Sequence, residues 1–250
     1  MPRSYRQRDI ELLWGQAAAR CTFPKCRQRL VKEATNDDPI AIVGQIAHIV
    51  AHGQNGPRAD PDFPADELNK YHNLILLCPT HHTIVDRQHN TYTVPGLRDW
   101  KVNHEAWVQS QLPEEMSKVS FAELEVIAKA IVNNPAAPTT NFTILNPSEK
   151  MDRNGLSVRV LSWITLGLAQ ARLVGQFIHR FSTTDDQFPE RLKAGFVTKY
   201  HELYAEGKRG DALFEELRLF SCSGFHDVRF QAASLAVLAY LFESCEVFER

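Results

Sequence analysis

The sequence predicts an α+β protein in two parts, a mixed N-terminal domain and an all-helical C-terminal bundle. Short apolar and β-branched runs that suit strands occur before residue 95, whereas from Gly155 onward the chain has helical patterns and no strand signal. Residues 133–141, rich in Asn, Pro and Thr, have the composition of a linker. We therefore predict an N-terminal domain over residues 1–112, a helix and Pro-rich linker over 113–147, and a helical domain over 148–250.

The N-terminal elements follow from local composition. Apolar residues at helical spacing predict a helix over residues 5–19, and β-branched residues predict an extended segment over 40–50. Gly, Pro, Asp and Asn predict a loop over 52–66, and the apolar run from Leu74 to Leu77 predicts a short buried strand. Pro79 suits the first position of a helix, where its missing N–H costs nothing. We predict that helix to about residue 87, an extended segment over 91–94 and a helix over 95–112.

The C-terminal half reads as a series of helices separated by polar or Gly-containing breaks. After a helix over residues 119–132, the apolar spacing predicts four more helices. The last of these is apolar on nearly every side, which is typical of a helix at the centre of a bundle. The four predicted helices cover residues 157–181, 188–206, 210–221 and 226–248.

Composition excludes several classes of protein. The chain has 250 residues, of which 44% are hydrophobic and 23% charged, as in ordinary globular proteins and unlike disordered ones. No apolar run approaches the roughly 20 residues that a membrane span needs, and the first residues lack an apolar signal core. We therefore expect a cytoplasmic protein with no membrane partner. The five cysteines, an odd number, favour metal ligation and free thiols over a disulfide framework.

Two cysteine-containing pairs have the spacing of a zinc site. Cys21 and Cys26 form a Cys-x4-Cys pair, and Cys78 and His81 form a Cys-x2-His pair. Together they supply four ligands for a tetrahedral structural zinc ion. The alternative is that all four are ordinary core residues, but pairs placed on either side of a central motif are arranged as in a zinc finger. We therefore predict a structural zinc site.

A second set of polar residues lies between and after these pairs. His82 and Asp86 fall at positions i and i+4 of the helix predicted from Pro79, so one cation can reach both side chains. Upstream, His48 ends the predicted extended segment and Asn73 precedes the Leu74 strand. In chain order, His48, Asn73 and His82 spell the pattern His…Asn…His.

Over roughly residues 18–110 the chain resembles the HNH endonucleases. The resemblance includes the Gly56-Pro57-Arg58 loop, the string from Asn73 to His82 and the tail from Leu97 to Glu105. It implies a ββα-metal fold, in which a hairpin is followed by one helix, held by a zinc knuckle. It also implies hydrolysis of phosphodiester bonds, for which an enzyme needs a base, a cation and exact positioning.

The same resemblance implies a role for each residue of the motif. His48 becomes the general base, because a neutral imidazole accepts a proton from water near neutral pH. Asn73 holds the His48 segment through its amide, and His82 and Asp86 bind a catalytic Mg, Mn or Ni ion. Arg58 is either a phosphate contact or a loop residue that faces solvent.

One position departs from the pattern of the family. Many members carry an acidic or second metal-binding residue immediately before the base histidine, where this chain has Ala47. Gln45, His52 or His72 could take over that function, or water could fill the position. If none does, the alternative is a zinc-stabilised DNA-binding scaffold whose nuclease site has decayed.

DNA is the expected substrate. Residues 1–32 contain eight Lys and Arg against Asp9 and Glu11, an excess of six positive charges in a chain whose net charge is −2. Such a cluster suits phosphate contacts, although a solvated basic face is common without that role. Sequence preference does not follow, because phosphate contacts carry no sequence information.

Residues 148–250 have the features of a binding or assembly module, because they lack a Gly-rich phosphate loop, paired carboxylates and a metal cluster. We expect a homo-oligomer or a protein partner there. Segments at 188–196, 210–217 and 236–248 resemble the helical C-terminal domains of bacterial ABC-three-component conflict systems. That resemblance implies an anti-phage effector controlled through this domain. The alternatives are a generic bundle that stabilises a dimer, or an HNH effector activated by a second messenger.

Overall fold

The computed structural model describes residues 5–32, 34–133, 147–244 and 248. The chain divides into two compact units, Met1–Ser110 and Gln111–Arg250. The division falls close to the end that we predict for the first domain, at residue 112. Apart from Asn133, which ends a helix, the predicted linker at 133–141 lies outside the described residues.

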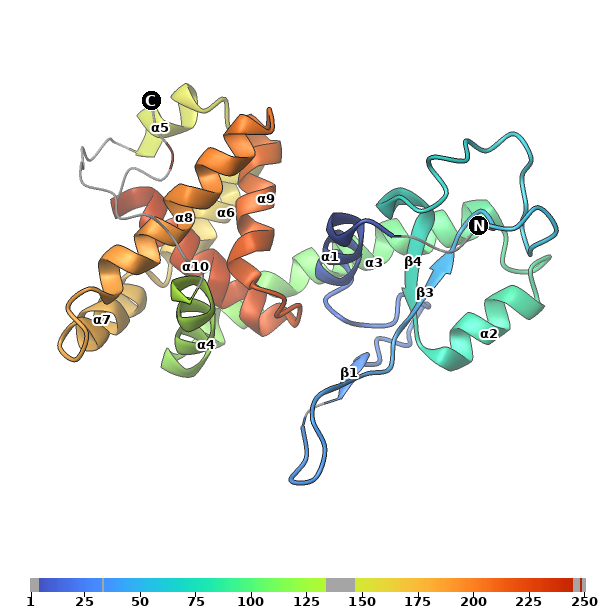
Figure 1. The fold of residues 1–250 in the computed structure, drawn as a ribbon, viewed down its shortest axis with the longest axis horizontal. Coiled ribbons are helices and arrows are strands. Elements are labelled where there is room, and N and C mark those ends of the chain that lie inside the picture. Colours follow the sequence, from blue (N-terminus) through green and yellow to red (C-terminus); the bar gives the residue numbers. More distant parts are fainter. Residues whose placement is uncertain (1–4, 33, 134–146, 245–247, 249–250) are drawn as a thin grey trace. The chain divides into compact units, whose positions relative to one another are not determined.

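The first unit contains two antiparallel strand pairs and a helix after the second pair (Figure 1). Strand β3 pairs with β4 so that Gln45 lies opposite Leu77 and His48 opposite Leu74. Helix α2 follows β4 directly and contacts both strands. This is the predicted ββα arrangement, and the α+β fold class is confirmed. The elements are α1 Gln7–Gln16, β1 Val31–Lys32, β2 Ala41–Ile42, β3 Gln45–His48, η1 Tyr71–Asn73, β4 Leu74–Leu77 and α2 Pro79–Arg87.

Strand β4 and the start of α2 lie where the sequence predicts them. All four residues of β4 are fully buried and belong to the core of the first unit. Cys78 is extended, with φ −73° and ψ 160°, and Pro79 occupies the first turn of α2. A four-residue apolar run followed by a helix-starting proline therefore sets both boundaries.

Three predicted elements of the first unit differ from the structure. Residues 91–94 are not extended, because the N–H groups of Thr91 and Tyr92 both donate to the carbonyl oxygen of Gln88 and form a turn. Helix α3, Val94–Lys118, begins within one residue of the predicted start but continues beyond the predicted end at residue 112, with Pro113 inside it. Helix α1 is shorter than the predicted 5–19, because the chain leaves the helix near Ala17 and the next two residues have positive φ.

The second unit is built from helices around α10 (Figure 1). Most residues of α10 are buried, and it contacts α4, α6, α7 and α9, which confirms its predicted central position. The predicted helix over 157–181 is wrong, because the chain turns at Ala169 and Gln170 and makes two helices. No helix in the described ranges is both long and apolar enough to cross a bilayer. The helices are α4 Phe121–Val132, α5 Pro147–Arg153, α6 Val158–Leu168, α7 Ala171–Ser182, α8 Phe188–Ala205, α9 Gly210–Cys222 and α10 Val228–Ser244.

Gly167 allows α6 and α10 to approach closely, and we expect Gly167→Ala to destabilise the second unit. A Cβ atom at this position would lie 2.6 Å from the Cβ of Ala239 and 2.7 Å from the carbonyl oxygen of Leu235. Overpacking of this kind costs about 1–3 kcal/mol of unfolding free energy, which chemical denaturation measures. Gly175→Ala is the matched control, because its nearest contact is 3.5 Å away and alanine favours helix. Equal effects would contradict the close approach.

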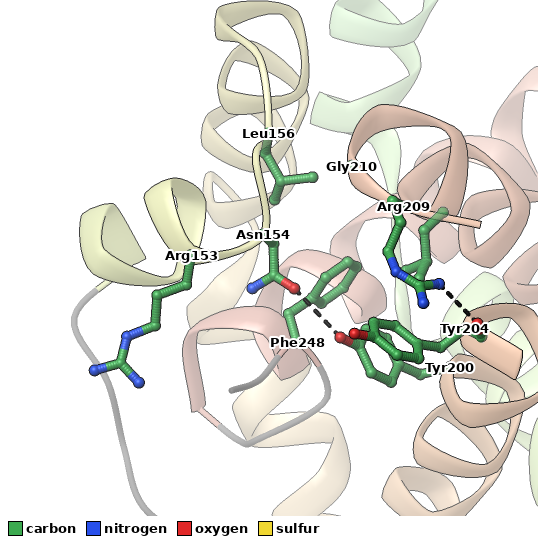
Figure 2. Close-up of a pocket in the computed structure, with 9 residues that line it drawn as sticks. Arg153, Asn154, Leu156, Tyr200, Tyr204, Arg209, Gly210 and Phe248 are labelled. Atoms are coloured by element: carbon green, nitrogen blue, oxygen red, sulfur yellow. Dashed lines mark hydrogen bonds between the residues drawn. The ribbon is translucent and has the colours of Figure 1, made fainter. Parts of the chain in front are cut away.

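The second unit also contains a small cavity of about 100 Å³ (Figure 2). The guanidinium of Arg209 lies 3.3 Å from the ring centroid of Tyr204, and its Nη1 donates to the carbonyl oxygens of Tyr204 and Lys208. The hydroxyl of Tyr200 donates to Asn154 Oδ1 at 3.3 Å. These polar groups bond to the protein itself, and we assign no function to the cavity.

Candidate active site and zinc site

The four predicted zinc ligands lie together. The ligand atoms of Cys21, Cys26, Cys78 and His81 are all within 4.8 Å of one another. His81 Nδ1 lies 3.1 Å from Cys78 Sγ and 3.6 Å from Cys21 Sγ. Local backbone structure explains the cluster. Cys78 is the N-cap residue of α2, which places His81 in the first turn of that helix. Cys26 ends a turn in which its N–H donates to the carbonyl oxygen of Phe23. The set fits a metal ion such as zinc, whose tetrahedral ligands lie about 3.3–3.8 Å apart.

Aromatic rings pack around this cluster, and two of its cysteines, Cys21 and Cys78, are buried. The ring of Phe23 stacks on His81 with centroids 3.8 Å apart, and the rings of Tyr92 and Trp100 contact Phe23 edge-on. Burial raises the pKa of the Cys21 thiol to about 12 and lowers the pKa of His81. A bound dication reverses this effect at the thiol, because a coordinated sulfur is a thiolate. The cluster is therefore suited to a structural ion that is shielded from water.

The predicted base, His48, is the last residue of β3 and is only 8% exposed. Its Nε2 lies 2.9 Å from the amide oxygen of Asn69. Because an amide oxygen only accepts, this bond places the ring proton on Nε2 and makes Nδ1 the proton-accepting nitrogen. The rings of Tyr5 and His52 lie 5.8 Å and 5.5 Å from the His48 ring. Asn69 is thus a further residue of the site, and no motif or spacing in the sequence marks it.

Asn73, the last residue of η1, is 1% exposed and bonds to the chain just after His48. Its Oδ1 accepts from the N–H of Val50 at 2.8 Å, and its Nδ2 donates to the carbonyl oxygen of Val50 at 3.0 Å. The same Nδ2 donates to the carbonyl oxygen of Leu68 at 2.9 Å. The amide therefore donates and accepts at once, and fixes the backbone two residues beyond His48.

The two predicted ligands of the catalytic ion lie on one face of α2. His82 Nδ1 and Asp86 Oδ2 are 3.8 Å apart, and both side chains are partly exposed. A carboxylate and an imidazole at this separation fit a single hard or borderline divalent ion, with water or phosphate as the other ligands. Among the described residues, the zinc set is the only group of three or more His, Cys, Asp or Glu that converges in this way.

Of the residues considered as substitutes for Ala47, Gln45 begins β3 opposite Leu77 and is exposed, and the two histidines have other neighbours. Ala47 itself is buried, and its partner in the strand pair is Ile75. His72 pairs with Glu67, at 3.2 Å between Nε2 and Oε2. His52 lies beside His48 rather than on α2. Two protein ligands from α2 are therefore the set that the geometry offers.

Arg58 points into the protein. Its side chain is 4% exposed, and its guanidinium donates to three backbone carbonyl oxygens and to Asp86. Nε donates to Ile49 at 3.1 Å, Nη1 to Val85 at 2.6 Å, and Nη2 to His48 at 3.4 Å and to Asp86 Oδ1 at 2.7 Å. The guanidinium thus bonds to the polypeptide. A phosphate contact by Arg58 stays a prediction.

Two antiparallel strands, a following helix with His82 and Asp86, and a Cys/His cluster at its start define a small nuclease-type domain. The sequence profile of the HNH endonuclease family matches residues 24–90, which include β1 to α2 and every predicted residue of the active site. Residues 24–90 are thus an HNH endonuclease domain, and the resemblance found in the sequence is confirmed there. The match does not reach the helical unit. No curated protein matches the chain.

Proposed function

We propose that this chain is a divalent-metal-dependent endonuclease that hydrolyses phosphodiester bonds of DNA. One observation carries the proposal: the same nitrogen of Arg58, Nη2, bonds to the carbonyl oxygen of His48 and to the carboxylate of Asp86. The strand that carries the base and the helix that carries the ion ligands therefore meet at one point. We place the scissile phosphate beside the imidazole of His48 and the side chains of His82 and Asp86, and not at the buried guanidinium.

The chain's own residues supply the proton transfer and the positioning. Nδ1 of His48 takes a proton from water, and the water oxygen then attacks phosphorus while the bond to the leaving oxygen breaks and that oxygen gains a proton from solvent. Asn69 holds the His48 ring through Nε2, and Asn73 holds the backbone beyond it. A Mg, Mn or Ni ion bound by His82 and Asp86 would supply positive charge for the phosphate and the leaving oxygen.

Zinc would have a structural role in this scheme. Its four ligands join the loop after α1 to the start of α2, and three of them carry sulfur, which suits a closed site. The other predictions concern the helical unit, namely the anti-phage role, control by a partner or second messenger, and oligomerisation through residues 148–250. They stay predictions, because the family match ends at residue 90.

Plasmid cleavage tests the proposal. We expect the purified protein to nick or linearise supercoiled plasmid with Mg²⁺ or Mn²⁺ and not with chelator. His82→Ala removes one ligand of the catalytic ion, and we expect its cleavage rate to fall at least about 10–100-fold. Initial rates on agarose gels measure this.

His89→Ala is the matched control for that experiment, because His89 is an exposed histidine in the segment after α2. Its rate should equal that of the wild type. The alternative, a decayed scaffold, would be supported by a protein that binds DNA in gel-shift assays but does not cleave it with any divalent metal.

A further inference from the structure

Arg58 connects three parts of the first unit that are distant in sequence. It lies in the loop between β3 and β4, yet its guanidinium bonds to the end of β3, to the segment after it, and to the last turn of α2. The Arg58 side chain therefore bonds both to the residue proposed as the base, His48, and to a proposed ligand of the catalytic ion, Asp86.

The loop is folded to direct Arg58 inward. A Cβ atom on Gly56 would lie 2.8 Å from the Cβ of Ala51, so only glycine fits that approach. The N–H of Ala51 donates to the carbonyl oxygen of Arg58 at 3.3 Å, and Arg58 has a φ of +64°. A positive φ is unfavourable for a residue with a side chain, and the four bonds of the guanidinium offset that cost.

Arginine is the residue type that this arrangement requires. A guanidinium is planar and presents five N–H groups in fixed directions, whereas an ammonium group is a compact point charge. Three carbonyl oxygens and one carboxylate in different directions fit the planar fork. Lysine would keep the charge and lose most of the bonds.

We propose that Arg58 is a positioning residue that aligns the ion-binding carboxylate of Asp86 with the base strand. It holds Oδ1 of Asp86 at 2.7 Å and leaves Oδ2 on the side of His82, 3.8 Å from its Nδ1. It also fixes the carbonyl oxygens of His48 and Ile49, so the base and the carboxylate keep one spacing. This inference rests on the proposed function, because it treats His82 and Asp86 as ligands of the catalytic ion.

A direct phosphate contact is the competing role for Arg58. Such a contact requires an accessible guanidinium with N–H groups directed outward. Here the side chain is almost fully buried, and its three nitrogens already donate four bonds. The two roles give opposite results in binding experiments.

Metal binding without DNA tests the positioning role. We expect Arg58→Lys to weaken Mn²⁺ binding by roughly 10–100-fold. Electron paramagnetic resonance of the bound and free Mn²⁺ measures this. The variant's affinity for DNA in chelator should be unchanged, and kcat should fall while KM stays the same. Arg87→Lys is the matched control, because Arg87 is an exposed arginine at the end of the same helix. Zinc content and thermal melts of each variant confirm that the first unit is folded.

Opposite results would overturn the inference. Unchanged Mn²⁺ affinity in Arg58→Lys, with weaker DNA binding in Arg58→Gln and a salt slope reduced by about one, would make Arg58 a phosphate contact. The wild-type protein gives a second readout that needs no variant: the ¹H–¹⁵N signal of Arg58 Nε should shift when Mg²⁺ is added. A signal that Mg²⁺ leaves unmoved would also overturn the inference.

The same measurements separate this inference from the proposed function. If the wild type cleaves DNA and Arg58→Lys binds Mn²⁺ with the wild-type affinity, the nuclease proposal stands and the positioning role fails. If Mn²⁺ binding depends on Arg58 but no DNA is cleaved, the positioning role stands and the nuclease proposal fails.

Discussion

Cys21→Ser is expected to remove zinc from the protein and to unfold the first unit. Cys21 is fully buried in the core cluster, and its Sγ accepts a hydrogen bond from the N–H of Cys78 at 3.3 Å. Structural zinc in zinc-finger peptides contributes apparent free energies of about 10–16 kcal/mol, whereas whole domains are stable by only about 5–15 kcal/mol. A serine hydroxyl does not replace a thiolate, so the loss exceeds what the first unit can absorb.

Zinc analysis and thermal melts measure this result. The wild type should contain one zinc ion for each chain, and Cys21→Ser should lose it together with the melting transition of the first unit. Cys222→Ser is the matched control, because Cys222 is buried in the second unit with its Sγ 3.1 Å from Ser234 Oγ. It should keep its zinc. A zinc-free Cys21→Ser that melts like the wild type would contradict a structural role for the ion.

The parts of the fold that the sequence predicts well are those set by local signals. The Leu74 to Leu77 run and Pro79 define β4 and the start of α2 without help from distant residues. The zinc set is also predictable, because its two pairs carry metal-ligand spacing. Helix α10 is predictable because it is apolar on nearly every side.

The parts that the sequence does not predict depend on contacts across the chain. Thr91 and Thr93 favour a strand by type, but the carbonyl oxygen of Gln88 draws the segment into a turn. The helix predicted over 157–181 breaks at Gln170, whose side chain donates to the carbonyl oxygen of Met116. Helical periodicity alone does not show such a break.

Two residues of the candidate site illustrate the same limit. Asn69 contacts His48 across 21 residues of sequence, and no motif marks that pairing. Arg58 is recognisable as part of the Gly56-Pro57-Arg58 loop, but its direction depends on how the loop packs against Ala51 and α2. Sequence motifs thus identify residue types for chemistry, whereas the partners that orient those residues emerge only from the folded chain.

His48→Ala is expected to lower the rate of plasmid cleavage by roughly 10²–10⁴-fold, the usual contribution of one general base. The fold and the zinc site should survive, because the imidazole lies at the end of β3 and is not a member of the Cys/His cluster. Initial rates, zinc content and thermal melts of the same preparation measure all three properties. Asn69→Leu should give a smaller loss of rate, since it removes only the bond that orients the ring.

Rescue separates a missing base from a damaged site. Imidazole added to the buffer should restore part of the activity of His48→Ala, because a free base can accept the proton from water. It should not restore His82→Ala, in which a ligand of the catalytic ion is missing. If His48→Ala loses zinc as Cys21→Ser does, or if imidazole rescues neither histidine variant, then His48 is a structural residue and the division between a base, a catalytic ion and a structural ion is wrong.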